Sequence, residues 1–312
     1  MIVDVHYHYM PSMSEEGAAR LVKYVMHQAE ILGIHAERDA LVRKILETWG
    51  DPTGEQLIRS MDEGGIDVTV AVTVDHFSRM TAETAQRQNK MLNNVVKRYP
   101  GRVIDLAGLD PRRPEAVAMA RYYLEDLGMK GLKYHPDHGY HPAGPESYRV
   151  LEVLARNKGL LLTHTSPLGP PARNAFSEAA LLSDLAVDFP EITIIAAHMN
   201  AINWRPWAAL AGMQPTLYGD LAMWDNLAFR NYDLFCRELR TIIDLVGAHK
   251  VLFGSDAPIH TLLQPINKWG GIIRDLPAKA PAGISFTREE VDLILGGNAM
   301  RILNLGKEEN ML

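Results

Sequence analysis

Histidine and aspartate residues stand where several short apolar runs of the chain end. They are His6 and His8 after the first run, His164 after a second, His198 after a third and Asp256 after a fourth. Imidazole and carboxylate groups are ligands that zinc and similar divalent ions accept. A buried histidine or aspartate without a partner is costly, so several of them together indicate a shared ligand. The pattern therefore predicts a metal site.

The pair His6 and His8 has the spacing of one face of a strand. Side chains alternate along a strand, so Asp4, His6 and His8 are expected on one face and Tyr7 on the other. The two imidazoles then lie about 7 Å apart and can converge on one ion. Asp4 either supports His6 from behind or faces solvent at the start of the strand. Taken alone, the pair also fits two ordinary histidines at a strand end.

Apolar runs alternate with amphipathic stretches along the whole chain. The runs predict strands at Ile2–His6, Val68–Val74, Val103–Leu109, Gly131–Tyr134, Leu160–His164, Ile192–His198, Thr216–Leu221 and Lys250–Gly254. The stretches predict helices that include Glu83–Arg98, Pro114–Leu127, Glu146–Asn157, Glu178–Phe189 and Tyr232–Val246. Most runs show little alternation, as parallel strands buried on both faces do. Eight such strands predict a (β/α)8 TIM barrel, with an open doubly wound sheet as the alternative.

The chain is longer than such a barrel needs. A barrel takes about 250 residues, whereas this chain has 312. We expect the surplus in a helical insertion after the first strand, around Glu15–Ile34, and in a long Pro- and Gly-rich loop after the eighth strand, at Pro258–Phe286. Both are expected over the C-terminal face as pocket walls, lids or subunit contacts. No linker divides the chain, so one domain over residues 1–312 is predicted.

Short motifs throughout the chain match one known family. They are Val3–His8, Met61–Asp67, Gly131–Pro136, the two strands that end in His164 and His198, Gly254–Pro258 and Gly297–Leu303. In this order and spacing they resemble the amidohydrolase superfamily, and within it the amidohydrolase-related group that contains aminocarboxymuconate-semialdehyde decarboxylase. The resemblance covers nearly the whole chain. It implies a (β/α)8 barrel, a catalytic His198 and a divalent ion held by His6, His8, His164 and Asp256.

Lys133 raises the question of a second metal ion. Some relatives carboxylate a lysine near the end of strand four, and that lysine and the histidine of strand six then take part in binding two ions. The corresponding residues here are Lys133 and His198. The related group implies a single ion instead. Zinc is the first expectation for that ion, and manganese also fits the ligand types.

These residues favour a metal-dependent hydrolase that acts on a small carboxylated substrate at an amide, lactone or similar carbonyl. A metal lowers the pKa of its bound water from 15.7 towards about 7. Asp256 can touch the metal and accept the proton of that water, and His198 can shuttle protons. The alternative is a non-oxidative decarboxylase on the same scaffold. A barrel that only binds partners is a third reading, but it would be expected to have lost ligands, and none is missing.

Five further residues are candidates for contacting the substrate. They are Arg173, Arg205, His76, His135 and His260. Arginine suits a carboxylate, which it binds in a bidentate pair, although either arginine equally suits surface charge. His135, His138 and His141 follow strand four in a loop that contains Pro and Gly, and at most one of them is expected to face the pocket. Trp204, Trp207 and Trp224 either wall an aromatic substrate or pack in the core.

The composition excludes several other classes of protein. The net charge is −6, and no basic stripe indicates nucleic acid. No apolar run reaches the roughly 18 residues that a membrane span needs, and the N-terminus lacks the pattern of a signal peptide. The single cysteine, Cys236, fits a reducing compartment, so we expect the cytoplasm. A small-molecule substrate is the expected partner. A homodimer is the commonest oligomer, but the sequence leaves the oligomeric state open.

Overall fold

Eight parallel strands form the centre of the computed structural model, which describes residues 1–305. They are β1 (Val3–His8), β2 (Val68–Val72), β3 (Val103–Gly108), β4 (Gly131–Tyr134), β5 (Leu160–His164), β6 (Thr193–Ala197), β7 (Leu217–Asp220) and β8 (Val251–Leu252). Each strand pairs with the next one in the sequence. All eight predicted strands are confirmed. Residues 306–312, the end of the predicted domain, lie outside the described residues.

The barrel closes between β1 and the segment that follows β8. The Val5 amide donates to the Phe253 carbonyl at 3.0 Å, and the His8 amide donates to the Ala257 carbonyl at 2.7 Å. In the other direction, the Asp256 amide donates to the His6 carbonyl at 2.9 Å. These bonds join the two ends of the strand order, so the (β/α)8 barrel is confirmed and the open sheet is excluded.

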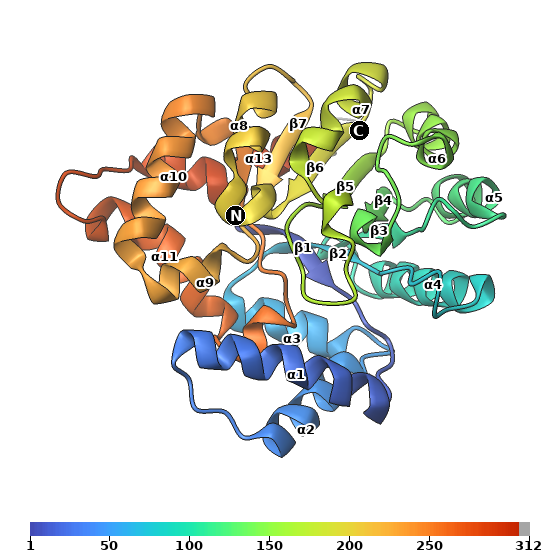
Figure 1. Ribbon diagram of the computed structural model, residues 1–312, viewed down its shortest axis with the longest axis horizontal. Coiled ribbons are helices and arrows are strands. Elements are labelled where there is room, and N and C mark those ends of the chain that lie inside the picture. Colours follow the sequence, from blue (N-terminus) through green and yellow to red (C-terminus); the bar gives the residue numbers. More distant parts are fainter. Residues whose placement is uncertain (306–312) are drawn as a thin grey trace.

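Helices surround the strands (Figure 1). They are α1 (Glu15–Leu32), α2 (Arg38–Trp49), α3 (Glu55–Gly64), α4 (Ala82–Arg98), α5 (Ala116–Arg121), α6 (Pro145–Arg156), α7 (Ser183–Asp188), α8 (Arg205–Ala211), α9 (Trp224–Arg230), α10 (Tyr232–Val246), α11 (Ile266–Lys279), α12 (Arg288–Asp292) and α13 (Asn298–Ile302). The helix predicted at Pro114–Leu127 is α5 followed by a π-helical turn, and the one at Glu178–Phe189 is a 3₁₀ turn followed by α7. Among residues 1–305, no helix has the length and apolar character to cross a bilayer.

The strands separate two hydrophobic clusters. On β5, Leu160 and Leu162 belong to the cluster inside the barrel, while Leu161 packs into the layer between the strands and the helices. A strand buried on both faces shows little alternation of polarity, because each face contacts apolar side chains. This burial explains why the apolar runs predicted the strands well.

The bulge in β1 changes the predicted direction of one side chain. Asp4 pairs with Thr69, but His8 pairs with Val72, so four steps along β1 match three steps along β2. One extra residue in a strand reverses the alternation beyond it. Val72 lies in the cluster inside the barrel. The prediction that Asp4 and His8 share a face is therefore wrong, and the bulge directs His8 into the barrel mouth.

The insertion after β1 consists of two helices. The predicted helix at Glu15–Ile34 is α1, and a second helix, α2, follows it (Figure 1). Val22, Val25 and Ile45 form a small apolar cluster with Leu262, which lies in the segment after β8. The insertion thus packs on the C-terminal side of the barrel, against the second predicted insertion.

The predicted long loop at Pro258–Phe286 is wrong over half of its length, because α11 occupies residues 266–279. Trp269, Ile273 and Leu276 are buried at helical spacing, and the Trp269 indole donates to the Gly254 carbonyl at 2.9 Å. Two glycines and Pro277 lower the intrinsic helix propensity of this segment. Burial of one apolar face outweighs that propensity.

Substitution Trp269→Ala tests the packing of α11. We expect it to lower the free energy of unfolding by about 3–5 kcal/mol, because it removes a buried indole and leaves a cavity. Chemical denaturation measures this loss. The exposed neighbour Lys268 provides the control, since Lys268→Ala is expected to change stability by less than about 0.5 kcal/mol. Equal effects of the two substitutions would contradict the assigned packing.

Candidate metal centre

The ends of four strands bring the predicted ligands together at the C-terminal rim of the barrel. His6, His198 and Asp256 each offer a ligand atom, and these atoms lie within 4.8 Å of one another. His8 Nε2 lies 3.1 Å from His6 Nε2 and 3.1 Å from Asp256 Oδ1. His164 lies at the edge of this group, with Nδ1 3.1 Å from His198 Nε2. The strand ends thus place all five side chains in one cluster.

The hydrogen bonds on the far sides of the rings determine which nitrogen faces the cluster. His6 Nδ1 lies 3.0 Å from Asp220 Oδ2, His198 Nδ1 lies 3.1 Å from the Ala222 carbonyl, and His164 Nε2 lies 2.9 Å from the Ser166 carbonyl. An oxygen acceptor holds the N–H, so the other nitrogen carries a lone pair. The lone pairs of His6 and His198 therefore lie close to Asp256, and that of His164 points towards His198. A divalent cation satisfies such a set, so these residues fit a metal ion.

The protonation states of the cluster also suit metal binding. Burial lowers the pKa of His6 and of His198 well below the ordinary value. Burial acts to raise the pKa of Asp256, but His6, His8 and His198 outweigh it and hold that pKa well below the usual range. The imidazoles of His6 and His198 are therefore neutral and the Asp256 carboxylate is ionised near pH 7. These are the forms that bind metal ions.

Lys133 lies beside the cluster, with Nζ 3.0 Å from His6 Nε2. Its side chain is buried, and burial lowers the pKa of the amine to about 8. The residue is thus within reach of the ligand set, as a second-metal arrangement would require. The position of Lys133 equally suits a cation that balances the charge of the ionised Asp256.

Asp220, at the end of β7, holds two members of the cluster. Its Oδ2 faces His6 Nδ1, and its Oδ1 accepts hydrogen bonds from the amides of His198 at 2.8 Å and Ala222 at 3.1 Å. Asp220 was not among the predicted site residues. The available signal was an aspartate near the end of a predicted strand, Thr216–Leu221, which is the same criterion that identified His164 and Asp256.

Two residues of the cluster have left-handed backbone conformations. The φ angle is 69° at His198 and 53° at Asp256. Such a conformation costs roughly 1–3 kcal/mol for a non-glycine residue and persists only where surrounding contacts impose it. The contacts here are the bond from the His198 amide to Asp220 and the bond from the Asp256 amide to the His6 carbonyl. The fold therefore directs these two side chains into the cluster, although their backbone conformations are costly.

Asp4 contacts the segment that follows β8 rather than solvent. Its carboxylate accepts from Ser255 Oγ at 2.6 Å, from the Ser255 amide at 3.0 Å and from the His6 amide at 3.0 Å. Burial raises the pKa of this carboxyl to about 7. Asp4 thus ties β1 to the residue before Asp256, and it supports the cluster from the opposite face of the strand.

A cavity of about 280 Å³ lies beside the cluster. Its lining includes His76, Arg79, Asp137, His138 and Arg173. Two predicted substrate candidates, His76 and Arg173, are therefore wall residues. The rings of His76 and His138 lie 4.8 Å apart. This volume is close to the lower limit of small-ligand pockets, about 300 Å³.

His135 connects this cavity with the cluster. Its ring stacks on His138 on one side and on His164 on the other, at 5.3 Å between ring centres in each case. Its Nδ1 lies 3.0 Å from Asp137 Oδ1, and its Nε2 is buried without a hydrogen-bond partner in residues 1–305. Of the three histidines of this loop, His138 lines the cavity and His135 and His141 do not, which agrees with the expectation that at most one of them faces the pocket.

The other predicted contacts lie elsewhere. Arg205 is 68 % exposed and lies 4.0 Å from Glu238, away from the cavity wall. Trp204, Trp207 and Trp224 pack in the hydrophobic core, which favours ordinary packing over a substrate wall. His260 is buried beside Asp256, at 3.4 Å from Oδ2.

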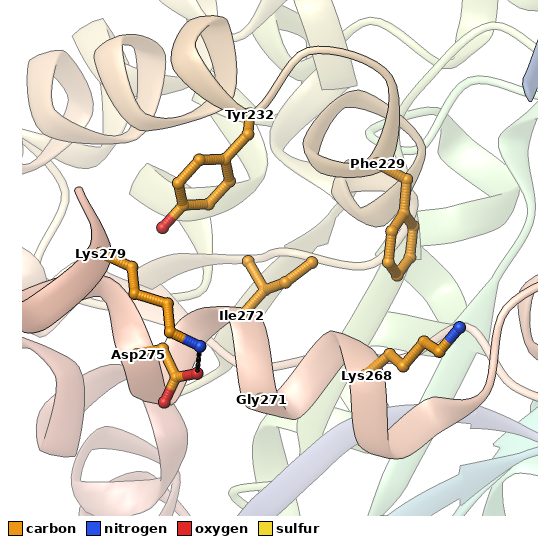
Figure 2. Close-up of a pocket in the computed structure, with 7 residues that line it drawn as sticks. All are labelled: Phe229, Tyr232, Lys268, Gly271, Ile272, Asp275 and Lys279. Carbon is orange, nitrogen blue, oxygen red and sulfur yellow. Dashed lines mark hydrogen bonds and ion pairs between the residues drawn. The ribbon is translucent and has the colours of Figure 1, made fainter. Parts of the chain in front are cut away.

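A larger cavity, of about 430 Å³, lies outside the barrel between α9, the start of α10 and α11. Figure 2 shows its lining residues, among them Phe229, Tyr232 and Ile272, and the ion pair between Lys279 and Asp275. None of the predicted site residues lines it. Cavity size alone therefore does not locate the chemistry in this protein.

A barrel with a histidine and aspartate cluster at its C-terminal rim is typical of metal-dependent enzymes. A family model described as amidohydrolase matches residues 3–305, and the chain belongs to this family. No curated protein matches the chain.

Solved structures share the fold over nearly the whole chain. An uncharacterised TIM-barrel protein from Bordetella bronchiseptica is 20 % identical, with a TM-score of 0.68 and coverage of 97 % of this chain and 98 % of that chain. The 5-carboxyvanillate decarboxylase from Sphingomonas paucimobilis is 18 % identical, with a TM-score of 0.64 and coverage of 97 % and 98 %. The dihydroxybenzoic acid decarboxylase from Polaromonas sp. JS666, solved with manganese and 2-nitroresorcinol, is 18 % identical, with a TM-score of 0.65 and coverage of 99 % and 98 %.

Substitution Asp220→Asn tests the support of the cluster. An amide has one acceptor oxygen where the carboxylate has two, so either the His6 ring or the His198 amide loses its acceptor. We expect the affinity for Mn²⁺ or Zn²⁺ to fall about 10- to 100-fold, as for other residues that orient metal ligands. Competition with a chelating dye measures it. Asp62→Asn, at a side chain 61 % exposed, is the control, and unchanged affinity in Asp220→Asn would refute the role.

Proposed function

We propose that this protein is a metal-dependent, non-oxidative decarboxylase of a small aromatic carboxylic acid. The observation that carries the proposal is the enclosure of the cluster. The side chains of His6 and Asp256 are 0 % and 8 % exposed. Excluding water weakens the solvation of a carboxylate and favours its loss as carbon dioxide. Hydrolysis, in contrast, needs a water molecule as a reactant at the same place.

The solved relatives support this reading over hydrolysis. Several of them are decarboxylases of hydroxylated or methoxylated benzoic acids. The hydrolase expected first from the sequence is the less supported reading. Its remaining support is the description of the family as amidohydrolase.

We further propose one divalent ion, held by His6, His8, His164 and Asp256. Manganese takes the place of zinc as the first expectation, because solved relatives contain manganese. When bound, this ion would supply the positive charge that holds the substrate carboxylate and stabilises charge on a neighbouring oxygen. The second-metal arrangement through Lys133 and His198 is the alternative, and metal content per chain separates one ion from two.

The protein side chains would then bind the acid and supply a proton. Decarboxylation breaks the bond between the ring carbon and the carboxylate, and its electron pair forms a C–H bond with one proton from the protein. We assign proton transfer to His198: its Nε2 lone pair, which faces the cluster, would take up a proton from solvent and pass it to the ring carbon, with the ionised Asp256 beside it stabilising the protonated ring. Arg173 and His76, in the cavity wall, would attract the anionic substrate. His135 would contact it between the cavity and the ion.

Two matched substitutions test the separate roles of His164 and His198. We expect His164→Asn to lower bound manganese because it removes a ligand. His198→Asn is expected to keep about one ion per chain and to lower kcat at least about 100-fold, since it removes the proton donor. Plasma mass spectrometry measures the metal and product formation measures kcat. Loss of the ion in His198→Asn with retention in His164→Asn would reverse the two assignments.

Isotope labelling tests the reaction itself. Manganese-loaded protein is incubated with 2,6-dihydroxybenzoate and 5-carboxyvanillate in D₂O that contains H₂¹⁸O. We expect carbon dioxide release, one deuterium at the vacated ring carbon and no ¹⁸O in the aromatic product. Asp256→Asn, which is nearly isosteric, is expected to abolish release. Turnover of an amide or lactone panel with ¹⁸O incorporation, without turnover of either aromatic acid, would establish the hydrolase instead.

A further inference from the structure

His260 is buried between two carboxylates. Its Nε2 lies 3.4 Å from Asp256 Oδ2, and its Nδ1 lies 3.4 Å from Asp225 Oδ1. The exposed fractions of the three side chains are 4 %, 8 % and 6 %. His260 lies outside the wall of the cavity next to the cluster. The cavity lining therefore gives no support to the predicted contact of His260 with the substrate.

The two oxygens of Asp256 have different neighbours. Oδ1 lies 3.1 Å from His8 Nε2 and 3.5 Å from His6 Nε2, which are the nitrogens that face the cluster. Oδ2 faces His260 instead. A carboxylate can bind a metal ion through one oxygen or through both. The contact with His260 engages one oxygen and leaves the other for the ion.

Asp225 holds the far side of the His260 ring. Asp225 lies in α9. Within residues 1–305 its Oδ1 has no hydrogen-bond partner, so this oxygen interacts with the chain through the ion pair with His260. The amide of Asn226 also lies 3.4 Å from His260 Nδ1. A buried carboxylate without a partner would be costly. This cost favours the position in which the His260 ring lies between Asp225 and Asp256.

The insertion after β1 holds the turn that carries His260. Lys44 Nζ, from α2, donates to the Leu262 carbonyl at 2.8 Å, and the Leu262 side chain packs in the cluster with Val22 and Val25 of α1. Tyr24 and Gln28 of α1 line a small cavity at His260. The two insertions thus meet at this histidine.

We infer that His260 is a positioning residue that, together with Asp225, holds Asp256 as a single-oxygen metal ligand. The inference rests on the proposed role of Asp256 in metal binding. It also assigns a purpose to the α1–α2 insertion, which keeps the turn at His260 against the rim of the barrel. In this arrangement the insertion acts on the metal centre through one imidazole, in addition to any role as a pocket wall.

The test compares His260→Gln, His260→Leu and Asp225→Asn with the control His35→Gln, whose side chain is 91 % exposed. We expect Mn²⁺ affinity to fall about 10- to 100-fold in His260→Leu and by less in His260→Gln, because glutamine keeps an N–H donor. At saturating Mn²⁺, kcat is expected to fall while KM changes less than about threefold. The Co²⁺-loaded His260→Leu protein is expected to show an altered visible absorption spectrum, since Asp256 can then bind through both oxygens.

A merely structural ion pair would lower the melting temperature and leave the Co²⁺ spectrum and Mn²⁺ affinity unchanged, and that result overturns the inference. If His260→Leu fails to fold, His260→Gln and Asp225→Asn provide the same comparison. Metal affinity and the spectrum need no turnover. Wild-type protein that binds Mn²⁺ tightly but releases no carbon dioxide would therefore refute the decarboxylase proposal and leave this inference standing.

Discussion

The convergence of unprotonated imidazole nitrogens on a buried carboxylate is the constraint on which the rest of the structure depends. Lone pairs on His6, His164 and His198 face one another because each ring donates its N–H to an oxygen behind it. The fold has to hold these groups in place, and a cation at their centre removes the repulsion between them. Asp220 and two carbonyl groups are therefore as much a part of the site as the rings they orient.

Several irregularities of the barrel serve this convergence. The bulge in β1 directs His8 inwards, and the left-handed residues His198 and Asp256 follow β6 and β8. Without the bulge, regular alternation along β1 would place Asp4 and His8 on the same face. Irregular backbone at a functional site is typical where strain is balanced by surrounding hydrogen bonds.

The surroundings of the centre divide into two sides with different chemistry. On one side, His135 and His138 lead to a cavity with two arginines, which suits an anionic substrate. On the other side, His260 and Asp225 form a buried ion-pair chain behind Asp256, covered by the insertion. The cavity and the ion-pair chain thus lie on separate elements, so each can be altered without removing the other.

The sequence by itself determined the fold class and most of the site. Apolar runs predicted all eight strands, because strands buried on both faces must be apolar. The side chains at the strand ends identified the cluster, because parallel strands place those ends on one rim. Periodicity did not reveal the bulge, since it depends on pairing with β2, and it did not reveal α11, since burial of Trp269 outweighs the low helix propensity there. Only the tertiary structure decided the partners of Asp220 and His260, because the contacts of Asp220 with His6 and of His260 with Asp225 join residues distant in the sequence.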